Sequence, residues 1–271
     1  MTEKKKIVAL VNPADEHTIE VMLRAKNEGV AEFRSFFGEE ACREAVACVR
    51  RSEADVLMKG AVNTDDLLRA ALDKENGILE KGRVMTHIAV ADIPGWNRPL
   101  IFSDAAVIPM PDIVQMDAIV RYTVEAAANL GIMEPKVALV NFTEKENPKF
   151  PQTAVFQEIR RRNYSFEVKG DNEVKEVRPV IGGPMDVKTA LDSESGAIKG
   201  IESPVVGNAD ILIFPNIEAG NTFYKTLTLF AHATIAGWLA GTEVPVVVTS
   251  RADSVESKYY SLITALKMTK R

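Results

Sequence analysis

Residues 244–257 read VPVVVTSRADSVES and decide which kind of fold the chain adopts. The apolar half of this stretch predicts a buried central strand over residues 244–249. The polar half predicts a loop and then a helix over residues 254–267, because Ser and Asp are favoured helix caps and Glu256 stands three residues after Asp253. A buried strand that leads through a short loop into a helix is the repeating unit of α/β proteins.

The same alternation extends outward over the rest of the chain. Short apolar runs predict strands at residues 7–11, 55–58, 84–90, 100–102, 137–142 and 211–214. Helical patterns predict helices at residues 17–28, 38–52, 64–73, 113–130, 153–163 and 222–239. Because strands that alternate with helices form parallel sheets through right-handed crossovers, the pattern predicts an α/β fold.

Composition excludes several classes of protein. Of the 271 residues 46% are hydrophobic, which is too many for a disordered chain, and the net charge of −5 argues against a general nucleic-acid binder. Two Cys and three separated His give neither a disulfide scaffold nor a metal motif. The apolar run 7–11 is too short for a signal peptide, and the uncharged stretch 226–242 predicts a buried helix rather than a membrane span. We therefore expect a cytoplasmic protein without nucleic-acid or membrane partners.

Three strand-to-helix turns carry side chains suited to ligand binding or catalysis. The first is DVLMKGAVNTDDLLR, residues 55–69. Lys59 ends a strand, Thr64 is placed to cap the next helix, and Arg69 lies one turn further on. Helix N-termini bind anions through unpaired N–H groups and the helix dipole. The alternative is that Thr64 is a plain cap and that both cations are surface charges.

The second turn is GNADILIFPNIEAGNTFYK, residues 207–225. Its loop carries Glu218, and Asn221 or Thr222 is placed to cap a helix. Gly220 permits either a close approach of a ligand to the backbone or a positive φ. Lys225 is then expected in the first helical turn, where a cation is unfavourable unless an anion lies beside it. A solvated Lys225 is the alternative.

The third turn is the opening stretch itself. Thr249, Ser250 and Arg251 emerge at the carboxyl end of its buried strand, where the planar guanidinium of an Arg is held rigidly enough to bind phosphate. Arg251 in a buried ion pair, and Asp253 or Ser254 as a helix cap, are the alternatives. The three turns together predict a phosphate-bearing substrate, whereas Walker A, Rossmann glycine and metal-ligand motifs are all absent from the sequence.

These three turns resemble those of a known family. Residues 56–72, 207–225 and 246–261 are similar to motifs of the phosphate acetyl/butyryltransferases, and SDAAVIP at residues 103–109 supports the likeness. TEKENPKFPQT at residues 143–153 and the SRADS form resemble the butyryl branch more than the acetyl branch.

The resemblance implies the reaction acyl-CoA + phosphate ⇌ acyl phosphate + CoA, with a butyryl or another short or branched acyl group, or alternatively acetyl. Coenzyme A is then a substrate, and no permanently bound cofactor or metal is expected. The implied fold has two three-layer α/β domains of the isocitrate/isopropylmalate-dehydrogenase type with a cleft between them, in a homodimer. The domains would comprise residues 1–118 with 251–271, and residues 119–250.

The resemblance also suggests roles for the candidate residues. We expect Arg69 and Arg251 to clamp phosphate and the oxyanion, and Ser250 to donate a hydrogen bond to the thioester carbonyl. The expected residues for binding substrate, CoA or phosphate are Lys59, Thr64, Asn208, Gly220, Asn221, Thr222, Lys225 and Thr249.

The general base is where this chain departs from the family pattern. The acetyl branch has an aspartate seven residues after the serine, which is thought to deprotonate CoA, and here Ser257 stands in its place. Asp253, Glu256 or Glu218 are candidates to replace it. A base is also less necessary when phosphate dianion attacks and CoA thiolate leaves.

Two other classes of function remain open from the sequence. One is a metal- and NAD-dependent hydroxy-acid dehydrogenase of the same fold, which would need clustered aspartates. The other is a non-catalytic protein that binds CoA or acyl phosphate.

Overall fold

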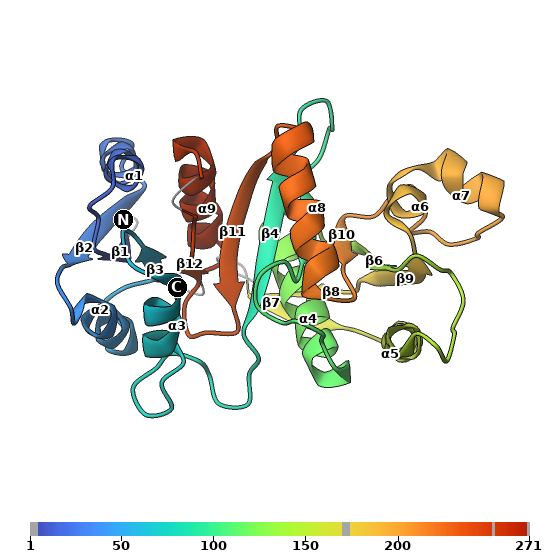
Figure 1. Ribbon diagram of the computed structural model, residues 1–271, viewed down its shortest axis with the longest axis horizontal. Coiled ribbons are helices and arrows are strands. Elements are labelled where there is room, and N and C mark those ends of the chain that lie inside the picture. The colour runs from blue at the N-terminus through green and yellow to red at the C-terminus, as the bar shows by residue number, and fades with distance from the viewer. Residues whose placement is uncertain (1–4, 170–173, 251–252, 270–271) are drawn as a thin grey trace. The chain divides into compact units, whose positions relative to one another are not determined.

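The computed structural model describes residues 5–169, 174–250 and 253–269. The chain divides into two compact units (Figure 1). Unit 1 comprises Met1–Met85 and Thr234–Arg271, and unit 2 comprises Thr86–Ala233. Each unit is an α/β structure of strands and helices, as the alternation in the sequence predicts.

Unit 1 is a sheet between two layers of helices. Its strand order is β2-β1-β3-β12-β11, and β1 pairs in parallel with β2 and β3. Figure 1 shows α1 and α9 on one face of this sheet and α2 and α3 on the other. Its elements are β1 (Lys6–Val11), α1 (Glu16–Asn27), β2 (Ala31–Phe36), α2 (Ala41–Arg50), β3 (Val56–Lys59), α3 (Thr64–Ala71), β11 (Thr234–Ala240), β12 (Val246–Val247) and α9 (Val255–Lys267).

The part of the sheet that lies in unit 2 has the order β4-β5-β10-β6-β9, and β10 pairs in parallel with β5 and β6. Helices α4 and α5 lie on one side of it, and α6 and α7 on the other (Figure 1). Its elements are β4 (Thr86–Asp92), β5 (Leu100–Ser103), α4 (Ile113–Asn129), β6 (Lys136–Val140), α5 (Pro151–Arg161), β7 (Phe166–Lys169), β8 (Val174–Val177), β9 (Val180–Met185), α6 (Val187–Leu191), α7 (Ser193–Lys199), β10 (Ile211–Ile213) and α8 (Ile217–Phe230). Strands β7 and β8 form a separate antiparallel pair.

The predicted helix over residues 222–239 is wrong in its second half. Helix α8 ends at Phe230, His232 has a φ of 51°, and the next residues form strand β11. An apolar stretch that is buried on all sides gives no periodicity to separate strand from helix. The left-handed backbone at His232 ends the helix, and the buried helix expected over residues 226–242 is therefore a helix end followed by a strand.

The sheets also differ from the parallel arrangement that the sequence predicts. Strand β4 pairs antiparallel with β5, and β11 pairs antiparallel with β12. The predicted strand over residues 244–249 is confined to the two residues of β12. Strand β2 was not expected, because its sequence AEFRSF carries charged side chains at the edge of the sheet.

The two units of the structure and the domains expected from the sequence divide the chain differently at residues 86–118 and 234–250. Residues 86–118 group with unit 2, since β4 pairs with β5, which in turn pairs with β10. Strand β11 groups with unit 1, because it packs against α9, where the Gly237 amide donates a hydrogen bond to Ser261 Oγ. Among the described residues no helix is long and apolar enough to cross a membrane.

A partly buried ion pair joins α1 to α9 in unit 1. Lys258, 3% exposed, donates to Asp15 Oδ1 at 3.0 Å, and Asp15 also caps α1 by accepting from the Thr18 amide. Burial raises the pKa of Asp15, but the hydrogen bonds from Thr18 and the charge of Lys258 outweigh it and lower the pKa from 3.8 to about 2. The carboxylate therefore stabilises the fold at neutral pH.

Replacing Asp15 by Asn should expose this contribution, since Asn still caps a helix but does not pair with Lys258 as an anion. We expect the free energy of unfolding at pH 7 to fall by about 1–2 kcal/mol after allowance for solvent screening. A carboxylate whose pKa is lower in the folded state stabilises that state fully above the pKa of the unfolded chain, and this stabilisation is lost as the pH falls to the pKa of the folded state. The difference in unfolding free energy between wild type and Asp15→Asn should therefore shrink between pH 4 and pH 2. Urea unfolding across that range measures it, with the exposed-pair variant Glu40→Gln as a control. A pH-independent difference would contradict the assignment.

Candidate active site

The carboxyl ends of three neighbouring parallel strands of unit 1 come together. Strand β3 lies between β1 and β12, with Val11 opposite Lys59 and Val247 opposite Met58. Lys59 therefore ends β3 beside the residues that follow β12, where Thr249 lies. Both side chains are buried, Lys59 at 4% and Thr249 at 7% exposure. Such an edge is where open α/β sheets place their ligands.

Gly60 fits this edge because it has no side chain. A Cβ there would lie 2.4 Å from the Val11 carbonyl oxygen and 2.5 Å from that of Asn12. The Gly60 amide donates to Val11 O at 2.8 Å, and Asn12 Nδ2 donates to Ala61 O at 3.2 Å. The loops after β1 and β3 are thus joined through their backbones, which fixes where Lys59 ends its strand.

Ser250 and Asp253 are joined by two hydrogen bonds. The Ser250 amide donates to Asp253 Oδ2 at 2.7 Å, and the Asp253 amide donates to Ser250 O at 3.2 Å. His17 lies against Asp253, with Nδ1 at 3.1 Å from Asp253 O. Ser250 itself is exposed, so its hydroxyl is accessible to a substrate. Arg251 lies outside the described residues.

Helix α9 is capped by Ser254, the second of the two caps that the sequence allowed. Ser254 Oγ accepts from the Ser257 amide at 3.2 Å. Asp253 does not cap the helix, because its carboxylate is turned back to Ser250. Ser257, at the position of the family's aspartate, lies in the first turn of α9.

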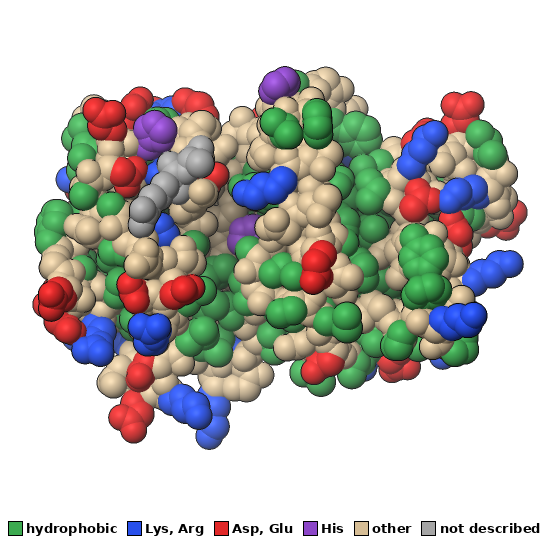
Figure 2. Space-filling view, viewed as in Figure 1, with side chains coloured by type: hydrophobic (Ala, Val, Ile, Leu, Met, Phe, Trp, Pro, Cys, Tyr) green, Lys and Arg blue, Asp and Glu red, His purple; other side chains and the backbone are tan. Residues whose placement is uncertain are grey.

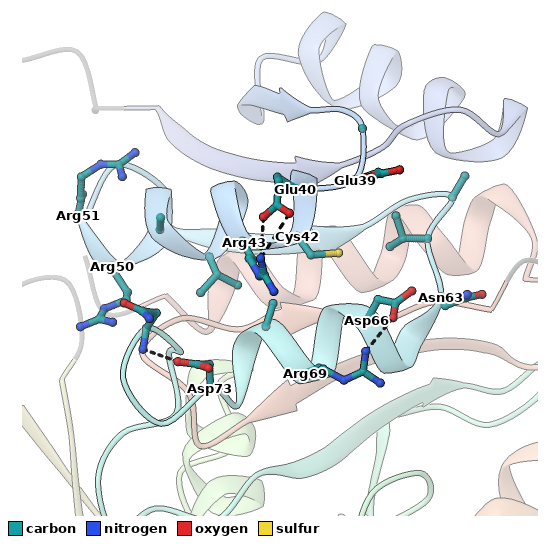
Figure 3. A pocket seen from close by; sticks show the side chains of 17 residues that line it. Glu39, Glu40, Cys42, Arg43, Arg50, Arg51, Asn63, Asp66, Arg69 and Asp73 are labelled. Carbon is teal, nitrogen blue, oxygen red and sulfur yellow. Dashed lines mark hydrogen bonds and ion pairs between the residues drawn. The ribbon is translucent and has the colours of Figure 1, made fainter.

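Arg69 lies in a groove of about 920 Å³ between α2 and α3 (Figure 3). Its side chain is 79% exposed and pairs with Asp66 at 3.3 Å. Arg43, Arg50 and Arg51 line the same groove, as does Cys42. Burial, followed by the charge of Asp66, raises the pKa of the Cys42 thiol, although Lys59 acts in the opposite direction, so this thiol is a poor nucleophile.

Thr64 is not the cap of α3, contrary to the expectation. The cap is Asn63, whose side chain makes no capping hydrogen bond, and Thr64 is the first helical residue. Extended backbone at Asn63, with ψ of 139°, starts the helix one residue earlier than the hydroxyl suggested. The acidic residues Asp65 and Asp66 occupy the first turn of α3 and stabilise the positive end of its dipole.

The start of α8 in unit 2 also differs from the expectation. Asn216 is the cap, since its Oδ1 accepts from the Ala219 amide at 2.9 Å, so neither Asn221 nor Thr222 caps the helix. The helix begins five residues before Thr222, and Lys225 consequently lies beyond the first turn. The expected place of Lys225 in the first helical turn is therefore wrong, and the helix dipole gives no reason of its own for an anion beside this side chain.

Gly220 and Asn221 are used for packing within unit 2. A Cβ on Gly220 would lie 2.1 Å from the Asp104 carbonyl oxygen, so the close approach that a glycine permits here is to backbone. Asn221 Nδ2 donates to Ala105 O at 2.9 Å. Glu218, Thr222 and Lys225 remain exposed on the helix.

An apolar pocket of about 680 Å³ lies beside α8 at the carboxyl ends of β10 and β6. Thr222 lines it, together with Met110, Phe142, Phe150 and Phe223. Met110 and Phe142 are 72% and 68% exposed, and the rings of Phe142 and Phe150 meet edge to face. Figure 2 shows hydrophobic side chains gathered on this part of unit 2. No single motif in the sequence indicates the pocket, because its residues come from five separate segments, two of which overlap the motifs at residues 143–153 and 207–225.

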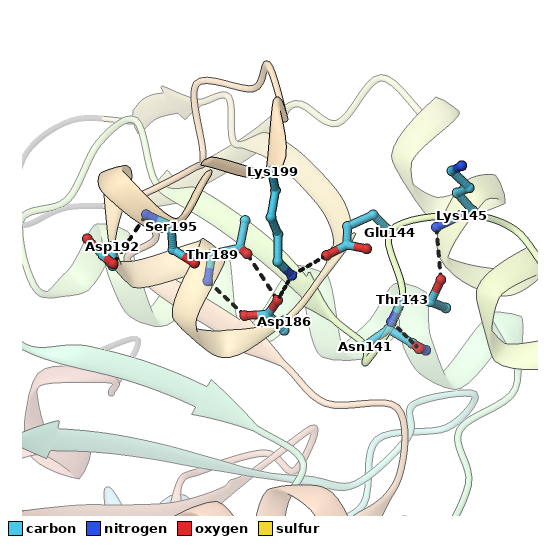
Figure 4. A network of polar contacts seen from close by, with 9 residues as sticks. All are labelled: Asn141, Thr143, Glu144, Lys145, Asp186, Thr189, Asp192, Ser195 and Lys199. Carbon is cyan, nitrogen blue, oxygen red and sulfur yellow. Dashed lines mark hydrogen bonds and ion pairs between the residues drawn. The ribbon is translucent and has the colours of Figure 1, made fainter. Parts of the chain in front are cut away.

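A polar network at the other rim of this pocket holds the loop after β6 (Figure 4). Lys199 pairs with Glu144 at 2.6 Å and also with Asp186. Asp186 caps α6 by accepting from the Thr189 amide at 2.8 Å. The network ties Glu144, in the loop after β6, to Lys199 of α7 and through it to the cap of α6. Asn208, a predicted binding residue, is exposed and donates to Val206 O instead at 3.0 Å.

The candidate residues thus form two groups. Lys59, Thr249, Ser250 and Asp253 lie together at one sheet edge of unit 1, with Arg69 in the adjacent α2–α3 groove. Gly220, Asn221, Thr222, Lys225 and Glu218 share α8 of unit 2. No cluster of three or more metal-ligating side chains occurs in the part of the chain that the structure describes.

Comparison with known families shows which family the chain belongs to. Residues 3–266 match the family model described as "Phosphate acetyl/butaryl transferase". The chain belongs to the phosphate acetyl/butyryltransferase family. The resemblance found in the sequence is confirmed, and the protein is an acyltransferase.

Curated relatives within this transferase family cover nearly the whole chain. A phosphate acetyltransferase of Thermotoga maritima is 38% identical over 96% of this chain and 93% of its own length. A phosphate butyryltransferase of Clostridium beijerinckii is 39% identical over 84% of this chain and 72% of its own. A crystal structure of a branched-chain phosphotransacylase from Enterococcus faecalis superposes with a TM-score of 0.83 at 28% identity, covering 98% of this chain and 99% of that one. This transferase therefore has the mixed α/β fold of phosphotransacylases.

Proposed function

We propose that the protein transfers an acyl group between CoA and phosphate, in the reaction acyl-CoA + phosphate ⇌ acyl phosphate + CoA. The observation that carries the proposal is the edge of unit 1 where buried Lys59 ends β3 beside the residues that follow β12, which include exposed Ser250, within the segment that matches the family. CoA is a substrate in this reaction and not a resident cofactor.

The chemistry requires charge stabilisation more than a nucleophile. When a phosphate oxygen attacks the thioester carbon, the carbonyl oxygen gains negative charge, and the C–S bond then breaks to release CoA thiolate. Ser250 Oγ is accessible to donate a hydrogen bond to that oxygen, and Arg251 and Arg69 supply positive charge for phosphate and the oxyanion. Direct transfer in a ternary complex needs no enzyme nucleophile, which agrees with the raised pKa values of the Cys42 and Cys48 thiols.

The base is assigned to Asp253 in the direction that consumes acyl phosphate. Ser257 at the family's aspartate position does not act as a base at neutral pH, since a hydroxyl is too weak. Asp253 Oδ2 lies 2.7 Å from the Ser250 amide, so the carboxylate is held beside Ser250, where it can accept a thiol proton. Glu218 lies on α8, in unit 2, and remains the second candidate.

The remaining binding residues are assigned to phosphate and CoA. Lys59 and Thr249 contribute charge and a hydroxyl at the strand ends of unit 1. On α8, Thr222 and Lys225 are exposed and available to bind phosphate groups. Asn221 is exposed as well, and its amide nitrogen, which donates one hydrogen to Ala105 O, has a second hydrogen for a phosphate oxygen. Three further residues are assigned to the edges of the proposed binding groups: Thr64 in unit 1, and Asn208 and Gly220 in unit 2.

The acyl group is proposed to be butyryl or another short or branched chain, with acetyl as the alternative. Support comes from the butyryltransferase and branched-chain phosphotransacylase among the relatives, while the Thermotoga relative is named for acetyl transfer. A thiol-release assay across acyl-CoA chains of two to six carbons tests the choice. We expect phosphate-dependent release with a maximum at four or five carbons. A maximum at acetyl-CoA would move the protein to the acetyl branch, and no release with any chain would contradict the function.

We further propose the isocitrate/isopropylmalate-dehydrogenase-like architecture, a cytoplasmic location and a homodimer. The dimer is supported by exposed apolar side chains of unit 2, namely Met110, Val114, Phe142, Leu229 and Phe230. Light scattering coupled to size exclusion should give about twice the chain mass of 29.8 kDa. Leu229→Asp with Phe230→Asp should shift the mass toward the monomer, and an unchanged dimer would place the interface elsewhere.

A further inference from the structure

Asp104 is a buried carboxylate of unit 2 that the proposed mechanism does not use. It is 2% exposed and directly follows β5. Its Oδ1 accepts from the amides of Ala106 and Val107 at 2.8 and 2.9 Å. Its Oδ2 accepts from Thr86 Oγ1 at 2.7 Å and from the amides of His87 and Ile108 at 3.1 and 3.3 Å. Five donors thus converge on one carboxylate and fix the shape of residues 104–108.

The backbone of this loop is the surface against which α8 begins. The Asp104 carbonyl oxygen would lie 2.1 Å from a Cβ on Gly220, so helix and loop are in direct contact. Asn221 Nδ2 donates to Ala105 O at 2.9 Å, and the Ile217 amide donates to Pro109 O at 2.9 Å. The first two turns of α8 are therefore placed by carbonyl groups whose own positions Asp104 sets.

A second connection runs through the strand that Asp104 holds. The His87 amide donates to Asp104, and the His87 ring lies 6.4 Å from the ring of Tyr224 on α8. Lys225 Nζ in turn lies 4.9 Å from the centre of the Tyr224 ring. Asp104 therefore contacts both the loop 104–109 and His87, which are the two parts of unit 2 that pack against the segment of α8 carrying Asn221 and Lys225.

We propose that Asp104 is a positioning residue, which places the substrate-binding side chains of α8 through the loop 104–109 and His87. The inference rests on the proposed function, because it requires that Asn221 and Lys225 contact CoA or phosphate. An aspartate is needed because all five partners are donors. In an Asn, the amide group would replace one acceptor oxygen by a further donor and leave at least two partners unpaired.

The kinetic test compares Asp104→Asn with a matched control. If α8 binds substrate equally in the ground and transition states, displacing it raises KM and leaves kcat nearly unchanged. We expect the KM for acyl-CoA or phosphate to rise about tenfold while kcat changes less than about threefold. The control is Asp210→Asn, a part-buried aspartate of unit 2 that accepts from the Lys136 amide and pairs with Arg98, and it should lower the melting temperature without changing KM.

Two additions keep the test decisive. Thr86→Val removes one donor to Asp104 with little change in shape and should raise KM about threefold if Asp104→Asn does not fold. Hydrogen exchange of the α8 amides should be faster in Asp104→Asn than in wild type, and this readout does not depend on activity. An inactive wild type would refute the proposed function alone, whereas wild-type KM values, or unchanged exchange in α8, would overturn the role of Asp104.

Discussion

Arg251→Ala is expected to lower kcat/KM for phosphate-dependent thiol release about a hundredfold or more without lowering the melting temperature. Arg251 follows the exposed Ser250 directly in sequence, in the stretch that matches the family. A single donor to a developing oxyanion contributes about 3–4 kcal/mol of transition-state stabilisation. Because the Arg251 guanidinium is proposed to hold phosphate as well, its removal abolishes both the oxyanion stabilisation and the phosphate contact. Steady-state kinetics with butyryl-CoA and phosphate measure the loss.

Conservative and distant variants show whether the effect is specific to this Arg. Arg251→Lys keeps the charge but not the planar fork, so we expect a loss intermediate between wild type and Arg251→Ala. Arg34 lies on the edge strand β2 and pairs with Glu53. The kcat/KM of Arg34→Ala should stay within about twofold of wild type. Wild-type turnover in Arg251→Ala would remove this residue from the site.

Gly60→Ala should cause the largest loss of stability, about 3 kcal/mol. The added methyl would lie 2.4 and 2.5 Å from the carbonyl oxygens of Val11 and Asn12, and 2.9 Å from the Asn12 carbonyl carbon. Because these are backbone atoms at the ends of paired strands, they move only if β1 and β3 separate. Thermal unfolding should show a melting temperature lower by roughly 6–12 °C. Activity should fall as well, since Lys59 precedes Gly60.

Gly29→Ala is the matched control for that variant. Gly29 also lies in unit 1 and has a φ of 70°, but nothing lies within 4 Å of a Cβ built there. Its substitution adds backbone strain without a clash and should cost about 1 kcal/mol. Equal destabilisation by the two variants would contradict the close contact between the loops after β1 and β3.

The sequence predicted the parts of the fold that are local. The alternation of apolar runs with helical patterns located β1, β3, β10 and α9, and the hydroxyl of Ser254 was among the caps foreseen for α9. Helix α8 was misplaced because its true cap, Asn216, lies within what reads as a loop, and because the change to β11 depends on one left-handed residue.

Site residues whose positions depend on where a strand ends could be predicted from the sequence. Residues whose roles depend on tertiary contacts could not. The positions of Lys59 and Ser250 follow from where β3 and β12 end. The packing role of Gly220 depends on the backbone of Asp104, which lies in a distant segment of the chain that no local pattern connects to α8. The pairing of Arg69 with Asp66 is different, because the spacing of three residues on a helix could have indicated it, and Asp66 competes with any substrate for that guanidinium.

Simultaneous measurement of thiol and acyl phosphate tests the central claim most directly. The purified protein is mixed with butyryl-CoA, with and without phosphate, and free CoA and butyryl phosphate are quantified in the same samples. Transfer to phosphate predicts one butyryl phosphate for each CoA released, and neither product when phosphate is left out. Release of CoA at the same rate without phosphate, with no acyl phosphate formed, would show a thioesterase and contradict the proposed function.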